Sequence, residues 1–231
     1  MKIYKFKDAF QTAEKLADFI TKIIKNNTKN YKKTAIALSG GMTASYYLSL
    51  LAHKDVDWNW VHFFWIHERM VSPDSSKSNF KMVQQTFFDK IRIPHNNIHR
   101  IKGELKNNAK EDYEKELLKY FGSKDKIIFD IVLLGLNENG YISSFHPDYY
   151  NLFTNKENIV IILKDKTKLQ MARITLSLEI INRANNIIVY AFGLDKQKAF
   201  SIFLKELKDK SQKSRIFPIL NKKKLFIFSD I

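Results

Sequence analysis

The chain has 231 residues, of which 45% are hydrophobic and 13% aromatic, so it carries enough apolar surface for a substantial core. It contains no cysteine, which excludes disulfides, thiolate nucleophiles and cysteine-based zinc sites. The net charge of +15 raises the question of a nucleic-acid partner, but the lysines are scattered and no basic stripe alternates with aromatic residues. We interpret the charge as a solvated surface whose positive potential attracts phosphorylated metabolites.

Nothing in the sequence indicates export or membrane insertion. The first ten residues lack the apolar stretch of a signal peptide, and no later run approaches the ~20 apolar residues of a membrane span. Seven glycines and four prolines argue against linkers, and no internal repeat is visible. We therefore expect a soluble cytoplasmic protein with one domain over residues 1–231 and no nucleic-acid or membrane partner.

The hydrophobic pattern predicts strands that alternate with helices. Residues 8–27 have apolar positions at helical spacing, with one buried face. Strands are then predicted at 33–41, 61–68, 127–136, 158–164 and 186–193, and helices at 42–52, 78–91, 173–184 and 195–207. Residues 224–231 are predicted to form a last strand, at an edge. This alternation predicts an α/β fold with a mostly parallel sheet and helices on both faces.

Parallel sheets of this kind bind ligands at the carboxyl ends of their strands, so the loops after Leu38, Trp65 and Leu134 are candidates for a site. In the first loop, Gly40 and Gly41 allow backbone N–H groups to approach an anion at the start of the next helix. Hydroxyl donors flank them at Ser39 and Thr43. The alternative is a tight turn with a Ser/Thr cap.

The second loop carries three ionisable residues, His67, Glu68 and Arg69, at the end of a strand. Arg69 offers a forked hydrogen bond to a phosphate or carboxyl oxygen. The alternative is a surface ion pair between Glu68 and Arg69 with a solvated His67.

The third loop, "GLNENGYISSFHP", follows a strand that is apolar throughout. Residues 137–140 form the turn, and Ser143 and Ser144 are placed to cap the next helix or to donate to a ligand. The alternative is an ordinary strand–turn–helix connection.

The three loops together resemble one family. "LSGGMT", "VHFFWIHERMVSPDSSKSNFKMV" and "FDIVLLGLNENGYISSFHP" are similar to motifs of 6-phosphogluconolactonases, which share a superfamily with glucosamine-6-phosphate deaminases. The resemblance runs from about residue 5 to the C-terminus. It implies a Rossmann-like doubly wound fold and the hydrolysis of 6-phospho-D-glucono-1,5-lactone to 6-phosphogluconate in the oxidative pentose phosphate pathway. It implies no metal and no organic cofactor, and a monomer or weak homo-oligomer is expected.

The resemblance assigns the substrate-binding residues. Those expected to bind the substrate or its phosphate are Ser39, Gly40, Gly41, Thr43, Arg69, Asn79, Gly140, Lys168 and Arg173. Two catalytic positions depart from the family pattern. The family's third-loop motif is G-x-x-x-D-G-H, in which the histidine is the general base. In this sequence Asn139 replaces the aspartate and Tyr141 replaces the histidine. In the second loop, His67 replaces the aspartate of the family.

The departures bear directly on the chemistry. Tyrosine has a reference pKa near 10 against roughly 6.5 for histidine, so Tyr141 is a poor base at neutral pH. We expect the roles to have moved, with His67 as general base and Tyr141 orienting the water or donating to the carbonyl. His146 lies about 140° around a helix from Tyr141 and is a weaker candidate.

Other functions remain open from the sequence. A catalytically weak or inactive homologue would still bind a sugar phosphate. A glucosamine-6-phosphate deaminase or isomerase fits less well, because "SSFHP" stands where that branch has an A-F-N-E-P-like stretch. A nucleic-acid binder would show strongly salt-dependent retention on DNA and is the least favoured.

Overall fold

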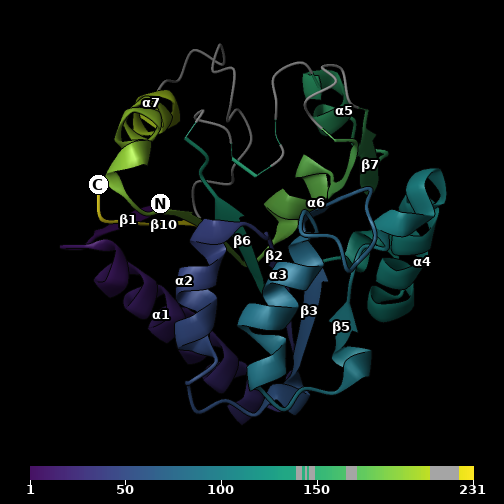
Figure 1. Ribbon diagram of the computed structural model, residues 1–231. Coiled ribbons are helices and arrows are strands. Elements are labelled where there is room, and N and C mark those ends of the chain that lie inside the picture. Colours follow the sequence, from purple (N-terminus) through teal and green to yellow (C-terminus); the bar gives the residue numbers. More distant parts are fainter. Residues whose placement is uncertain (139–141, 144, 146–148, 165–170, 209–223) are drawn as a thin grey trace.

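The computed structural model describes residues 1–138, 142–143, 145, 149–164, 171–208 and 224–231. Within these residues, seven strands form a parallel sheet in the order β1-β10-β9-β6-β2-β3-β5 (Figure 1). Their bounds are Lys2–Lys5 (β1), Leu225–Ser229 (β10), Asn186–Ala191 (β9), Ile131–Gly135 (β6), Thr34–Leu38 (β2), Val61–Trp65 (β3) and Ile98–His99 (β5). The predicted α/β class with a mostly parallel sheet is confirmed.

A second, antiparallel sheet lies beyond the carboxyl ends of the first (Figure 1). It has the order β4-β8-β7, with bounds His67–Arg69, Arg173–Leu176 and Val160–Leu163. β4 follows β3 directly after Ile66. The register pairs Arg69 with Arg173 and His67 with Thr175, so this sheet brings residues more than 100 positions apart to the rim of the large sheet.

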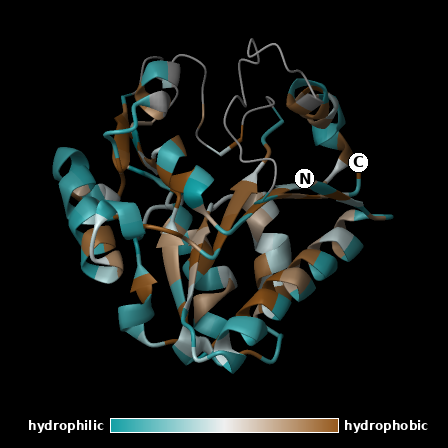
Figure 2. Ribbon diagram, turned by 180° about the vertical axis from the view of Figure 1, so that it is seen from behind, coloured by the Kyte–Doolittle hydropathy of each residue, from teal (hydrophilic) through white to brown (hydrophobic). Residues whose placement is uncertain are grey.

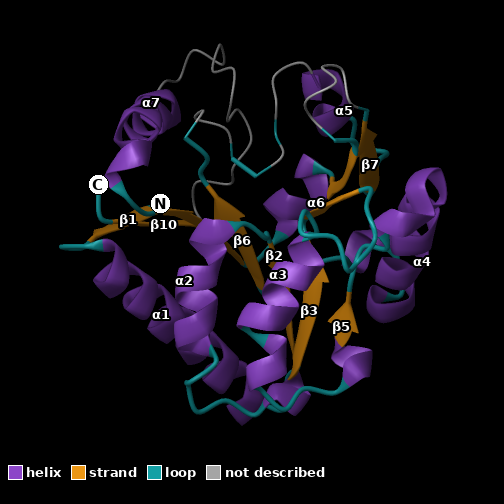
Figure 3. Cartoon of the chain, in the orientation of Figure 1, coloured by secondary structure: helices purple, strands orange, loops and turns teal. Residues whose placement is uncertain are grey.

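The helices surround the large sheet (Figure 3). Their bounds are Ala9–Lys29 (α1), Met42–Leu51 (α2), Asn79–Thr86 (α3), Ala109–Phe121 (α4), Tyr150–Thr154 (α5), Leu178–Arg183 (α6) and Gln197–Lys208 (α7). Short 3-10 helices lie at Trp58–Trp60, Phe88–Lys90, His95–Asn97, Gly103–Asn108, Lys124–Lys126 and Leu194–Lys196. Three helices start where a polar side chain accepts a backbone N–H: Asp8 caps α1, Ser78 caps α3 and Ser177 caps α6.

The core lies between the strands and the helices. Every residue of β2 and β3 is buried, as expected for strands covered on both faces. α1 faces this core with Ala13, Leu16, Ala17, Ile20 and Ile24. The strands are accordingly the most hydrophobic elements and the outer helix faces are hydrophilic (Figure 2). None of the helices in the described residues is long and apolar enough to cross a membrane.

The strand predicted at 61–68 divides into β3 and β4, the helix predicted at 78–91 ends at Thr86, and two further elements differ in type or in place. Residues 173–184 were predicted as one helix, but Arg173–Leu176 is a strand and the helix starts only after Ser177. The β-branched pair Ile174-Thr175 favours a strand, and the Ser177 side chain accepts the N–H of Ile180 and starts the helix. The predicted edge strand at 224–231 lies instead between β1 and β9. β1, whose four residues are too few for a clear hydrophobic pattern, takes the edge.

Candidate active site

Two adjoining pockets open at the carboxyl edge of the large sheet. We call the first the lysine pocket; it has a volume of about 370 Å³ and its lining includes Gly40, Thr43, Glu138, Tyr190, Asp195 and Lys196. We call the second the arginine pocket; it has a volume of about 510 Å³ and its lining includes Arg69, Lys77, Ser78 and Asn79. Gly41, Met42 and Arg173 line both. Arg173 therefore borders the two compartments, and one elongated ligand can contact both.

The glycine turn forms the wall that the pockets share. Gly41 has a φ of 103°, and no side chain in the described residues caps the first turn of α2. The positive end of the helix dipole therefore lies at Gly41 and Met42, which line both pockets. At Gly40, a Cβ atom would lie 2.4 Å from Cβ of Asn79. Glycine is therefore required for the turn to pack against α3.

Ser39 lies below this wall and outside the lining of both pockets. Its side chain is 2% exposed. The hydroxyl donates to the Leu133 carbonyl at 3.0 Å and lies 2.9 Å from Oγ of Ser143. Ser39 thus connects the end of β2 to β6 and to the third loop, and it supports the site from beneath.

Lys196 is a site residue that the sequence analysis missed. Its ammonium group donates to Oγ1 of Thr43 and to the Phe192 carbonyl. Burial lowers the pKa of Lys196, while Asp195, Asp230 and Glu138 act in the opposite direction. The signal was present, because the loop after the strand ending at Ala191 also lies at a carboxyl end of the sheet.

Arg69 and Asn79 meet in the arginine pocket. Nη1 of Arg69 donates to the Lys77 carbonyl at 2.7 Å and to Oδ1 of Asn79 at 3.2 Å. Behind them, Glu68 is buried and its carboxylate accepts four hydrogen bonds, from the N–H groups of Arg69, Asn79 and Phe80 and from the Ser78 hydroxyl. The surface ion pair considered for Glu68 and Arg69 is therefore not what the structure shows, since Glu68 organises the loop internally.

His67 is 9% exposed and lies behind Asn79. Nδ2 of Asn79 lies 3.2 Å from Nδ1 of His67 and donates to the His67 carbonyl at 3.0 Å. Burial, together with the nearby charges of Arg173 and Arg69, lowers the pKa of His67 to about 3. The ring is therefore neutral at pH 7 and a weaker base than an ordinary imidazole.

The other predicted site residues divide into two groups. Gly40, Gly41, Thr43, Arg69, Asn79 and Arg173 line the two pockets. Gly140, Tyr141 and Lys168 lie outside the described residues, as do Asn139, Ser144 and His146.

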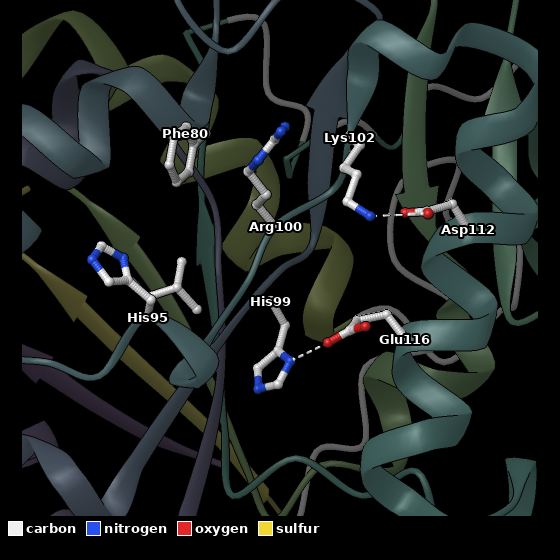
Figure 4. A pocket seen from close by; sticks show the side chains of 8 residues that line it. Phe80, His95, His99, Arg100, Lys102, Asp112 and Glu116 are labelled. Carbon is white, nitrogen blue, oxygen red and sulfur yellow. Dashed lines mark hydrogen bonds and ion pairs between the residues drawn. The ribbon is translucent and has the colours of Figure 1, made fainter.

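A third pocket, of about 280 Å³, lies beside α4 and the edge strand β5 of the large sheet (Figure 4). Two cations there pair with carboxylates, Lys102 with Asp112 at 3.0 Å and Arg100 with Glu104 at 2.6 Å. The buried ring of His99 lies with Nδ1 2.7 Å from the Glu116 carboxylate. Because both of these cations are already paired, this pocket is a poorer anion site than the arginine pocket, whose lining includes Arg69, Lys77 and Arg173 and no carboxylate among the described residues.

Comparisons with known proteins show which family this sequence matches. Residues 7–221 match the model of the family described as glucosamine-6-phosphate isomerases/6-phosphogluconolactonase. The 6-phosphogluconolactonase of Aggregatibacter actinomycetemcomitans is 32% identical over 188 residues, 79% of this chain and 77% of the relative. That of Haemophilus influenzae is 31% identical over 193 residues, 81% of each chain.

Solved structures share the fold over nearly the whole chain. The 6-phosphogluconolactonase of Thermotoga maritima superimposes with a TM-score of 0.83 at 25% identity, covering 99% of this chain and 98% of the other. The enzyme of Trypanosoma brucei gives a TM-score of 0.80 at 21% identity, covering 99% and 95%.

Proposed function

This chain belongs to the family of glucosamine-6-phosphate isomerases and 6-phosphogluconolactonases, and from this premise we propose that it hydrolyses 6-phospho-D-glucono-1,5-lactone to 6-phosphogluconate in the oxidative pentose phosphate pathway. The observation that carries the proposal is the pair of pockets bordered by Arg173. A sugar lactone with a phosphate at one end and a carbonyl at the other matches two compartments of this kind.

The lysine pocket is the proposed phosphate end. Lys196 and Arg173 supply positive charge there, Thr43 supplies a hydroxyl, and the N–H groups at Gly40 and Gly41 supply backbone donors. Cations and free N–H groups at a helix start are the groups that bind phosphate in proteins. Gly140 and Lys168 remain predicted contributors to this binding.

The arginine pocket is the proposed lactone end. Arg69 and Asn79 line it, and we propose that they orient the sugar ring. His67 and Tyr141 are the proposed catalytic residues. Water attacks the carbonyl carbon, and the reaction needs donors for the negative charge that develops on the carbonyl oxygen.

Water is the only co-reactant of the proposed hydrolysis, and the family resemblance implies neither a metal nor an organic cofactor. We further infer that residues 1–231 act as a single domain in the cytoplasm, as a monomer or weak homo-oligomer without a nucleic-acid or membrane partner.

The direct test is to generate the lactone in situ with glucose-6-phosphate dehydrogenase and to follow acid release with and without this protein. The expected result is acid release faster than spontaneous opening, and slower release when Arg173 is replaced by alanine. Lys198→Ala is the matched control, because Lys198 is exposed and lies outside both pocket linings. A rate equal to that without protein contradicts the proposal.

A second readout separates binding from turnover. Addition of 6-phosphogluconate is expected to raise the melting temperature, since a ligand that binds only the folded state stabilises it. A raised melting temperature without acid release identifies the alternative, a catalytically weak or inactive sugar-phosphate-binding homologue.

A further inference from the structure

We propose that His67 acts as a neutral hydrogen-bond donor rather than as a general base, with its Nε2–H group binding the carbonyl oxygen of the lactone as negative charge develops there. This inference rests on the proposed lactonase function for its chemistry. Its structural part, the position of the proton on the His67 ring, stands independently of that function and can be tested on the protein alone.

The argument begins with the side-chain amide of Asn79, whose orientation is fixed from both ends. Oδ1 of Asn79 lies 3.2 Å from Nη1 of Arg69, and a guanidinium group can only donate. Nδ2 of Asn79 lies 3.0 Å from the carbonyl oxygen of His67, which can only accept. Reversing the amide would break both hydrogen bonds.

The orientation of the amide determines the tautomer of His67. Nδ2 of Asn79 is 3.2 Å from Nδ1 of His67, and because Nδ2 is a donor, Nδ1 must present its lone pair. A neutral imidazole carries one proton, so that proton is on Nε2. The low pKa of His67, about 3, keeps the ring in this neutral state at physiological pH. The nitrogen that a general base would use is therefore either occupied by Asn79 or already protonated.

The surroundings of Nε2 suit a developing anion. Within the described residues, the His67 ring makes its hydrogen bond at Nδ1 and none at Nε2. The guanidinium groups of Arg69 and Arg173 lie close enough to lower the pKa of the ring, and both line the arginine pocket together with Asn79. An N–H donor flanked by two cations in a buried setting stabilises an oxyanion strongly.

The chemical step is balanced without any further reactant. The oxygen of water forms a bond to the carbonyl carbon, and the carbonyl π electrons move onto the oxygen that Nε2–H of His67 binds. When this intermediate collapses, the bond between the carbonyl carbon and the ring oxygen breaks. One proton of the water ends on the ring oxygen as a hydroxyl group. The other ends on the carboxyl group, which ionises to solvent. His67 keeps its proton throughout.

The first experiment measures the tautomer by ¹⁵N NMR on the full chain labelled at histidine, with His67→Gln used to assign the signals. The expected result is a protonated Nε2 and an unprotonated Nδ1, unchanged between pH 5.5 and 8. Protonation on Nδ1, or titration of the ring within this range, overturns the proposal. This measurement does not require activity, so it separates the inference from the lactonase assay.

The second experiment compares two substitutions of similar size. His67→Leu removes the donor and is expected to lower kcat by about 10²-fold with a small change in KM, as for loss of an oxyanion donor. His67→Gln keeps an N–H group near the position of Nε2 and is expected to retain most of the activity. The matched control is His62→Gln, which replaces another buried histidine, on strand β3. Equal kcat values for His67→Leu and the unsubstituted protein overturn the proposal.

The third experiment reverses the tautomer. In Asn79→Asp, one carboxylate oxygen still accepts from Arg69, while the other loses the hydrogen bond to the His67 carbonyl and accepts a proton on Nδ1 of His67. Nε2 then becomes unprotonated in the neutral ring, and the pKa of His67 rises. Activity is expected to fall at pH 8 and to recover as the pH is lowered and the ring takes a second proton. A purely structural role for His67 predicts no such recovery, and a flat loss at all pH values contradicts the proposal.

Discussion

Lys196 places a positive charge at a position where burial disfavours it. Burial lowers the pKa of this lysine, but Asp195, Asp230 and Glu138 raise it, and the ammonium group also holds Thr43. Asp230 also holds the turn that precedes Lys196, because its carboxylate accepts the Gly193 N–H at 3.0 Å. A phosphate in the lysine pocket would give this charge a fully complementary partner.

Replacing Lys196 by alanine is therefore expected to raise KM for the phosphorylated lactone by about 10–100-fold, the range for loss of a hydrogen bond between charged groups. We expect kcat to change much less, because the phosphate does not react. Steady-state kinetics on the lactone check this. Lys198→Ala, with its side chain exposed on α7, should leave KM unchanged; equal effects of the two substitutions would disprove the assignment of Lys196.

At the scale of single residues, the sequence predicted several of the residues that line the two pockets, whereas the role of each residue stays a prediction. Arg69, Asn79 and Arg173 were predicted from the loops and the family pattern, and they line one pocket. The role that we propose for His67 could not be inferred from the sequence, because the tautomer of its ring depends on an Asn79 amide that Arg69 orients. Such a three-residue geometry has no signature along the chain.

At the scale of elements, Glu68 joins β4 to α3. Its two carboxylate oxygens accept the Asn79 and Phe80 N–H groups in the first turn of α3, the Arg69 N–H and the Ser78 hydroxyl. Burial raises the pKa of Glu68, whereas these hydrogen bonds to the charged form lower it and only partly offset the burial. Glu68 therefore connects the start of α3 to β4, in addition to the hydrogen bonds that Asn79 makes with Arg69 and His67.

We expect Glu68→Gln to destabilise the fold by about 1–3 kcal/mol, because the new NH₂ group faces N–H donors and leaves at least one of them unsatisfied in a buried position. Urea unfolding monitored by circular dichroism measures this. The comparison variant is Glu157→Gln, whose side chain is 91% exposed and lies 3.8 Å from Lys124; it should change stability by less than about 0.5 kcal/mol. A Glu68→Gln protein as stable as this control would show that the four hydrogen bonds are not needed.

The elements differ in how well the sequence predicts them. Long amphipathic α1 and the fully apolar strands β2 and β3 have clear patterns. The split of residues 173–184 at Ser177 was missed, although a serine at the N-cap with an acidic residue in the first turn, Glu179, is a helix-start signal. β4 and β8 are only three and four residues long, and they exist because they pair with each other across more than 100 residues of sequence.

At the scale of the whole molecule, a buried chain of hydrogen bonds ties the outer strands β3 and β5 to α4. Glu116 binds Nδ1 of His99 at 2.7 Å, and Nε2 of His99 lies 3.0 Å from Nδ1 of His62. Burial, with His99 and Lys33, lowers the pKa of His62 to about 4. Burial also lowers the pKa of His99, although Glu116 opposes this.

These shifts make the global stability dependent on pH in a defined direction. Because the pKa of His62 is lower in the folded state than the reference value of 6.5, the unfolded chain binds the proton more readily. The stabilisation by neutral His62 is complete above pH 6.5 and is lost as the pH falls towards 4, at up to about 1.4 kcal/mol per pH unit. Urea unfolding between pH 7.5 and 4.5 should show this loss, and His62→Gln should have a shallower dependence. If the free energy of unfolding fell equally with pH in His62→Gln and in the unsubstituted protein, His62 would not be the source of the pH dependence.

The global architecture was largely predictable because alternation of strands and helices leaves few arrangements of a parallel sheet. The order of the outer strands could not be predicted from the sequence. Residues 224–231 resemble an edge strand in composition, but β1 covers β10 from the other side, with Lys2 opposite Phe226 and Lys5 opposite Ser229. A pairing between the two ends of a chain leaves no local trace in either segment.

That pairing has a consequence for synthesis on the ribosome. β9 is made well before β10, and β1 is made first of all, yet both find their neighbour only when residues 225–229 emerge. Until then the β9 side of the nascent sheet exposes unpaired N–H and C=O groups of the kind that recruit foreign strands. Completion of this fold is therefore a late event, and a chain stalled before residue 225 is expected to aggregate or to engage chaperones.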